Sequence, residues 1–211
     1  ASAPMTTVDL LLAAAALAVA LALRPWRALG TGGPPWPWLA WTLAMPALWA
    51  ADRAAGMPLA QPLSGACLLM LMAGWPLAML ALVPVAALTA LAAGLDGAEA
   101  LQRAVWLGVV PATIAMAIGS AIRRWLPRHL FVYILGRGFF ATAIAGSAAG
   151  ALAVVLHGAP PGVPAGDLML ARFLAAWGDA FLSGMIAAIF VAFRPQWLAT
   201  WADRIWLPPP G

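Results

Sequence analysis

The sequence predicts an all-α, polytopic membrane protein with about seven transmembrane helices. Composition is the first reason: 64% of the 211 residues are hydrophobic and 9% are charged, whereas soluble domains are about 45–50% apolar and about 25% charged. Length is the second, because seven spans of about 20 residues would occupy roughly 140 positions and leave only short loops. The third is the placement of arginine, which predicts that the N-terminus lies outside and the C-terminus inside.

Seven apolar runs are separated by short charged, glycine-rich or proline-rich segments. No basic residue precedes the first run and Arg24 follows it, an order that argues against a cleaved secretion signal. We expect one helical domain over 5–193, with Met5 as its natural start; whether Ala1–Pro4 are native is left open. The expected spans are Val8–Leu23, Trp36–Ala51, Leu59–Ala73, Leu77–Ala93, Ala104–Ile122, Leu130–Leu156 and Leu168–Phe193.

The third and fourth spans share one uncharged stretch, Leu63–Gly94, which is too long for a single straight helix across a core of about 30 Å. Gly74, Trp75 and Pro76 interrupt it, and glycine and proline are the usual residues of a turn. Reading Leu59–Ala93 as one element would give six spans and would break the charge pattern.

Arginine supplies the orientation, because the chain has eleven arginines and no lysine. With the N-terminus outside, the outer loops hold Arg53 and Arg103, and this excess of inner arginines fits a multi-pass protein of the bacterial inner membrane. No basic run exceeds Arg123–Arg124, so we expect no nucleic-acid partner. The inner arginines are Arg24, Arg27, Arg123, Arg124, Arg128, Arg194 and Arg204.

Several features predict contact with membrane lipid. The segment 194–211 carries Trp197, Trp201 and Trp206, is too polar to span, and is expected to be an interfacial tail. Arg172 lies near the outer end of its span, where its side chain can extend to the headgroups. The GxxxG pattern of Gly146 and Gly150 predicts close approach of a neighbouring helix instead.

Asp179 is the main candidate for a functional residue, because it is a single acid near the middle of the last span. A carboxylate at that depth must be paired, hydrated or protonated. Arg137 lies about two turns inside the sixth span, roughly 10 Å below the level of Asp179. Both are candidate substrate-binding residues, and the alternative is a structural polar contact between helices.

A soft-ligand set is the candidate metal site. Cys67 and Met70 are three residues apart and so share a helix face; thiolate and thioether ligands suit Cu(I). Methionine in an apolar helix is more often packing material. Gln61, just before this helix, is a further candidate for substrate binding on the outer side.

Motifs for enzymatic chemistry are absent from the sequence: it has no Walker motif, nucleophile elbow, HExxH or CxxC. The lone Cys67 cannot form an internal disulfide. His129 and His157 are predicted on opposite sides of the membrane and cannot share a site. We therefore expect neither an enzyme nor a resident cofactor, and ATP-driven work would need a partner chain.

A serial order of motifs gives a resemblance over roughly Leu59–Asp203. The chain resembles the substrate-binding membrane component of energy-coupling factor transporters for cobalt and nickel, in particular a divergent branch of predicted permeases. The segments that carry the resemblance are Leu63–Cys67, Gly74–Ala78, Gly94–Ala98, Leu107–Ala112, Leu126–Ile134, Gly138–Phe140, Gly178–Ser183 and Phe193–Trp197.

The resemblance implies seven helices, an outer divalent-metal site, a transmembrane coupling subunit and a pair of ATPases. It also implies an acidic residue in the last span, where Asp179 stands. The cobalt and nickel members carry a histidine directly after the initiator methionine and another near the start of the short helix. This chain has Thr6 and Gln61 in those regions, so the imidazole ligands are missing.

These observations predict a substrate-binding permease subunit that takes up a small solute, with a transition metal ion as one possible cargo. The alternative is an accessory or assembly subunit of a larger membrane complex, which twelve tryptophans and short loops would also suit. An intramembrane enzyme is disfavoured because no paired nucleophile and base stand out.

Overall fold

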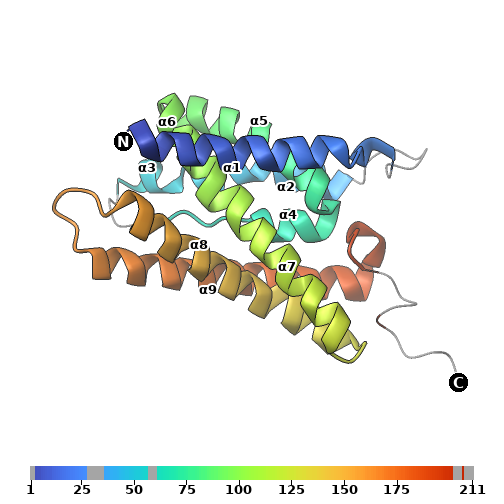
Figure 1. Cartoon of the computed structure of the whole chain (residues 1–211). Helices are drawn as coiled ribbons and strands as arrows, with labels where there is room; N and C mark the ends of the chain where they lie inside the picture. Colours follow the sequence, from blue (N-terminus) through green and yellow to red (C-terminus); the bar gives the residue numbers. More distant parts are fainter. Residues whose placement is uncertain (1–2, 28–35, 57–60, 202–205, 207–211) are drawn as a thin grey trace, which may run out of the picture.

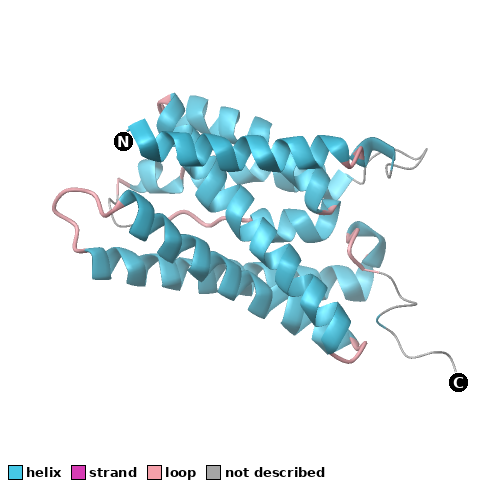
Figure 2. Cartoon of the chain, in the orientation of Figure 1, coloured by secondary structure: helices cyan, strands magenta, loops and turns pink. Residues whose placement is uncertain are grey.

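The computed structural model describes residues 3–27, 36–56, 61–201 and 206, and all regular secondary structure in these ranges is helical (Figure 2). Four helices are long and apolar enough to cross a membrane: Trp75–Ala93, Gly97–Trp125, Val132–His157 and Ala165–Phe193. The prediction of an all-α protein is therefore confirmed for the described residues, which include four helices that could span a membrane.

Two of the four long helices contain a π-helical segment, and no loop interrupts any of the four. α5 (Trp75–Ala93) ends at Gly94, whose φ of 62° is the left-handed conformation that glycine adopts without strain. The next helix is continuous through α6 (Gly97–Arg103), the π-helical segment η2 (Ala104–Val109) and α7 (Val110–Trp125). The third joins the π-helical segment η3 (Val132–Phe140) to α8 (Ala141–His157), and the fourth is α9 (Ala165–Phe193).

Helices α8 and α9 lie side by side (Figure 1), and small residues set their separation. A Cβ placed on Gly146 would come within 2.8 Å of Ala176, and one on Gly150 within 3.0 Å of Arg172. The close helix approach predicted from the GxxxG pattern is confirmed.

The remaining helices before α5 complete the bundle. They are α1 (Ala3–Ala22), the single turn η1 (Pro25–Arg27), α2 (Trp36–Trp49), α3 (Ala51–Ala55) and α4 (Ala66–Ala73). A helix of eight residues is about 12 Å long, so α4 alone cannot cross a bilayer. The expected helix over Leu59–Ala73 is wrong in this respect: residues 61–65 are not helical, and Leu59 and Ala60 lie outside the described residues.

α4 is the centre of the molecule, since all eight of its residues are buried. It contacts α2, α5, α7 and α9. The tail covers its C-terminal end: after the turn η4 (Pro195–Trp197), the N–H groups of Ala199 and Thr200 donate to the carbonyls of Met72 and Leu71. The tail was predicted to be interfacial; its Leu198 and Trp206 are buried against the protein.

The bundle has two ends (Figure 1), and they differ in charge. One end holds the start of α1, the helices α3 and α6, and the loop between α8 and α9; we call it the acidic end. It carries every described carboxylate except the deeply buried Asp179. The other, called the arginine-rich end, has no carboxylate among the described residues. Its arginines are Arg24, Arg27, Arg123, Arg124, Arg128 and Arg194.

Candidate functional site

Asp179 sits where α9 meets the N-terminal end of α4. Its side chain is 3% exposed, and its Oδ1 accepts a hydrogen bond of 2.9 Å from the backbone N–H of Gly65. Gly65 is the last residue before α4, so the carboxylate lies at the positive end of that helix. The described residues place no arginine or histidine in an ion pair with it.

Two tryptophans donate hydrogen bonds to the non-helical segment 61–65. Trp49 Nε1 donates to Ser64 O at 2.7 Å, and Trp41 Nε1 donates to Gly65 O at 2.9 Å. Non-helical backbone at membrane depth is tolerated only where protein or a water-filled cavity satisfies its polar groups. These indole N–H groups, both from α2, provide that satisfaction.

Ser64 connects the same segment to η2. Its Oγ donates to Leu107 O at 2.5 Å and accepts from the N–H of Ala66. In an α-helix, residue 111 would donate to this carbonyl, but Pro111 has no N–H. Pro111 therefore removes the α-helical donor to this carbonyl, and the Ser64 hydroxyl donates to it.

Two adjoining cavities, which we together call the funnel, lie between the acidic end and Asp179. Its wide part, which we call the vestibule, has a volume of about 540 Å³. Its deep part, the chamber, has about 30 Å³, room for roughly two water molecules. Asp179 and Ser64 line the chamber. Residues that line both parts are Gln61, Pro62, Trp106, Leu107 and Arg172.

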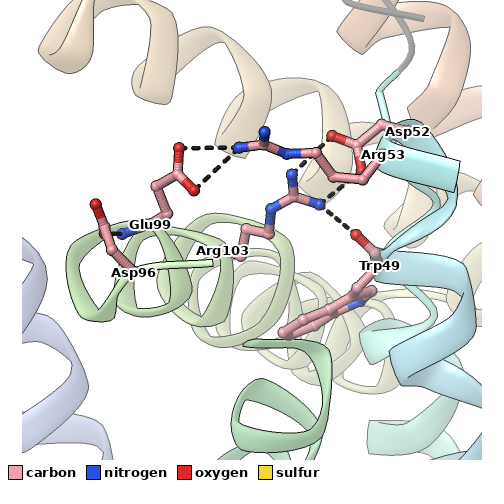
Figure 3. Close-up of polar contacts among 6 residues, drawn as sticks. All are labelled: Trp49, Asp52, Arg53, Asp96, Glu99 and Arg103. Carbon is pink, nitrogen blue, oxygen red and sulfur yellow. Dashed lines mark hydrogen bonds and ion pairs between the residues drawn. The ribbon is translucent and has the colours of Figure 1, made fainter. Parts of the chain in front are cut away.

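Ion pairs between α3 and α6 form one wall of the vestibule (Figure 3). Both carboxylate oxygens of Asp52 bond to Arg103, at 2.7 and 2.8 Å, and Arg103 also donates to Trp49 O. Burial alone would raise the pKa of Asp52, but the hydrogen bond and charge of Arg103 outweigh it and hold that pKa below its ordinary value. Glu99 pairs with Arg53 at 3.0 Å in a more exposed position.

The opposite wall contains a buried polar cluster. Asp9 of α1 is 2% exposed, and its Oδ1 bonds to Trp106 Nε1 at 2.8 Å and to His157 Nε2 at 3.2 Å. The His157 ring also packs edge-on against Trp106. The cluster joins α1, η2 and the end of α8 beside the vestibule, into which Trp106 and His157 project.

The predicted site residues separate into three groups. Asp179 and Gln61 both line the chamber. Arg137 lines neither part of the funnel; its neighbour Gly138 packs on Gly184, five residues beyond Asp179 along α9. The structure therefore does not bring Arg137 and Asp179 together.

Cys67 and Met70 are both buried in the core, at 1% and 2% exposure, and neither lines the funnel. Within the described ranges, no group of three or more histidine, cysteine, aspartate or glutamate side chains could hold a metal ion.

Sequence reasoning missed Asp9 and the residues that support the segment 61–65. Asp9 lies inside the expected span Val8–Leu23, and an acid inside an apolar run is itself a signal of a functional or paired residue. Its contacts with Trp106 and His157 span 97 and 148 positions and have no local pattern. The missing α-helical donor to the Leu107 carbonyl was predictable from the sequence, because Pro111 stands four residues later.

Comparison with known proteins identifies no relative: no family model, curated protein or solved structure matches the chain.

Proposed function

We propose that the protein is the solute-binding membrane subunit of a transporter, and that Asp179 binds the solute at the bottom of the funnel. The observation that carries the proposal is the funnel itself, which narrows from about 540 Å³ to about 30 Å³ and ends at a buried carboxylate. A charged group at that depth in a membrane protein is costly and usually serves a pathway.

The carboxylate of Asp179 favours a positively charged group or a strong hydrogen-bond donor on the solute, and Arg172, which lines the same chamber, favours an acceptor elsewhere on it. Among the described residues, one hydrogen bond reaches Asp179, through Oδ1, which leaves Oδ2 for a ligand. Gln61 and Ser64 add side-chain oxygens beside it. A broken helix with satisfied backbone next to a charged side chain is also the usual architecture of transporter sites.

The finer topology is part of the proposal: seven passes through a bacterial inner membrane, with the acidic end outside. Residues 61–65 are non-helical and α4 follows, so together they can reach at most about 28 Å, close to the thickness of the hydrocarbon core. Seven passes then comprise the four long helices, α1, α2 and this composite segment. The arginine-rich end would face the cytoplasm.

The resemblance to energy-coupling factor components supplies the proposed partners, a transmembrane coupling subunit and ATPase subunits. Co-purification of the full chain from its native membrane, followed by mass spectrometry, tests this. Recovery with an ATPase supports the transporter. Recovery with a large enzyme complex that lacks an ATPase would support the accessory subunit instead.

The binding role of Asp179 is tested by thermal shift with defined cations. We expect at least one of nickel, cobalt, manganese or a small organic ammonium ion to stabilise the purified wild type, and Asp179→Asn to abolish that shift. Asp167→Asn is the matched control, because Asp167 is an exposed acid on the same helix. Equal shifts in wild type and Asp179→Asn would refute the role of the carboxylate.

A further inference from the structure

Arg137 is a buried cation that the funnel does not use. Its side chain, in η3, is 8% exposed. Gly119 of α7 makes room for it: a Cβ at that glycine would lie 2.7 Å from Arg137 Nε. On its own helix, the guanidinium carbon lies 5.7 Å from the centre of the Tyr133 ring. Packing has therefore created a fitted place for the guanidinium.

Among the described residues, no carboxylate pairs with this guanidinium. The Nε is buried without a hydrogen-bond partner, and the ion pairs among the described residues involve Arg53, Arg103 and His157 instead. The arginine whose charge acts on Arg137 is Arg123, which has the same sign. Two like charges on helices that could span a membrane favour a counter-ion from outside the described part of the chain.

The surroundings indicate where that anion comes from. Arg137 lies within the span Val132–His157, so a ligand must reach it through the bilayer or its surface. Trp125 and Phe131, at the same end of the bundle, are 77% and 62% exposed, which is typical of side chains at the headgroup level. A planar guanidinium fork matches phosphate oxygens in two-point hydrogen bonding.

We propose that Arg137 and Arg123 form a binding site for the phosphate of an anionic phospholipid in the leaflet at the arginine-rich end. The fitted position over Gly119 presents the guanidinium, and the exposed Arg123 provides the second positive charge. The site is at the other end of the bundle from the vestibule, so its test does not depend on the transport proposal.

Native mass spectrometry of the delipidated full chain, titrated with phosphatidylglycerol or phosphatidylcholine, tests the site. We expect one phosphatidylglycerol to bind at least tenfold more tightly than phosphatidylcholine, and Arg137→Gln or Arg123→Gln to remove this preference. Arg24→Gln, an exposed arginine at the same end, is the matched control and should keep it. A preference for phosphatidylglycerol that survives Arg137→Gln would overturn the proposal.

Two further arms close the test. Inorganic phosphate alone should give no thermal shift at concentrations where the lipid does; an equal shift would overturn the lipid as the source. If Arg137→Gln does not fold, Arg123→Gln decides, because Arg123 is exposed and its removal leaves the core intact. Unchanged lipid preference in that variant would also overturn the site.

Discussion

Asp179 and Arg137 are both charged side chains buried in membrane spans, yet their surroundings differ. Asp179 has a backbone donor, Gly65, and a cavity; Arg137 has a buried Nε without an acceptor among the described residues, and it lies outside the funnel. Sequence alone identifies both, because a charge in an apolar run is rare. Their partners could not be predicted, since those belong to segments far away in the chain.

Asp52 gives a prediction that depends on pH. Because Arg103 holds its pKa below 3.8, the folded state favours the charged carboxylate. We expect the wild type to melt at a higher temperature than Asp52→Asn, because its free energy of unfolding at about pH 6 is larger by about 1 kcal/mol. This advantage should be complete above pH 3.8 and disappear as the pH falls through the lowered pKa. Thermal melting in detergent across this range measures it.

The matched control is Glu99→Gln, which removes the exposed pair with Arg53. Exposed pairs contribute little because water and salt screen them. A loss in Glu99→Gln as large as that in Asp52→Asn would contradict the importance of the partly buried geometry.

At the scale of elements, hydrophobic length predicted the long spans well. α5, α7, α8 and α9 all overlap the expected ranges, and the break at Gly74 is where α4 ends. The helix expected over Leu59–Ala73 is shorter in the structure, because apolar composition does not distinguish a helix from a buried extended segment. What determines the difference is the pair of indole hydrogen bonds from Trp41 and Trp49.

Gly65 gives the prediction at this scale. Its φ of 66° is left-handed, and an added Cβ would meet the Trp41 ring at 3.1 Å. Gly56 has a φ of 62° with nothing within 4 Å of an added Cβ, so it isolates the backbone effect. We expect Gly56→Ala to cost about 1–2 kcal/mol and Gly65→Ala about 1–3 kcal/mol more, measured by thermal unfolding. Equal losses of stability in the two variants would show that the Trp41 ring moves aside without cost, which would contradict the expected clash.

At the scale of the whole molecule, the separation of charge between the two ends was predictable from the loops, whereas the funnel was not. Arginines cluster beyond span ends, which a linear reading detects. The vestibule forms where α3, α6, η2 and the loop after α8 come together, and no local sequence pattern predicts that arrangement.

Orientation can be measured with single cysteines, because the native Cys67 is 1% exposed and should not react. His129 and Ala159 flank the two ends of one continuous helix, Val132–His157. We expect a membrane-impermeant thiol reagent to label Ala159→Cys in intact spheroplasts, and His129→Cys only after permeabilisation. The reverse pattern would contradict the proposed orientation.

α4 connects the contact between Gly65 and Asp179 with the C-terminal tail. Its first turn touches the Asp179 carboxylate through Gly65, and its last carbonyls are capped by Ala199 and Thr200 of the tail. Such a rod, about 12 Å long and clamped by packing on every side, transmits an axial push rather than absorbing it. A ligand that displaces Gly65 by a fraction of an ångström would therefore shift the tail at Ala199 and Thr200 as well.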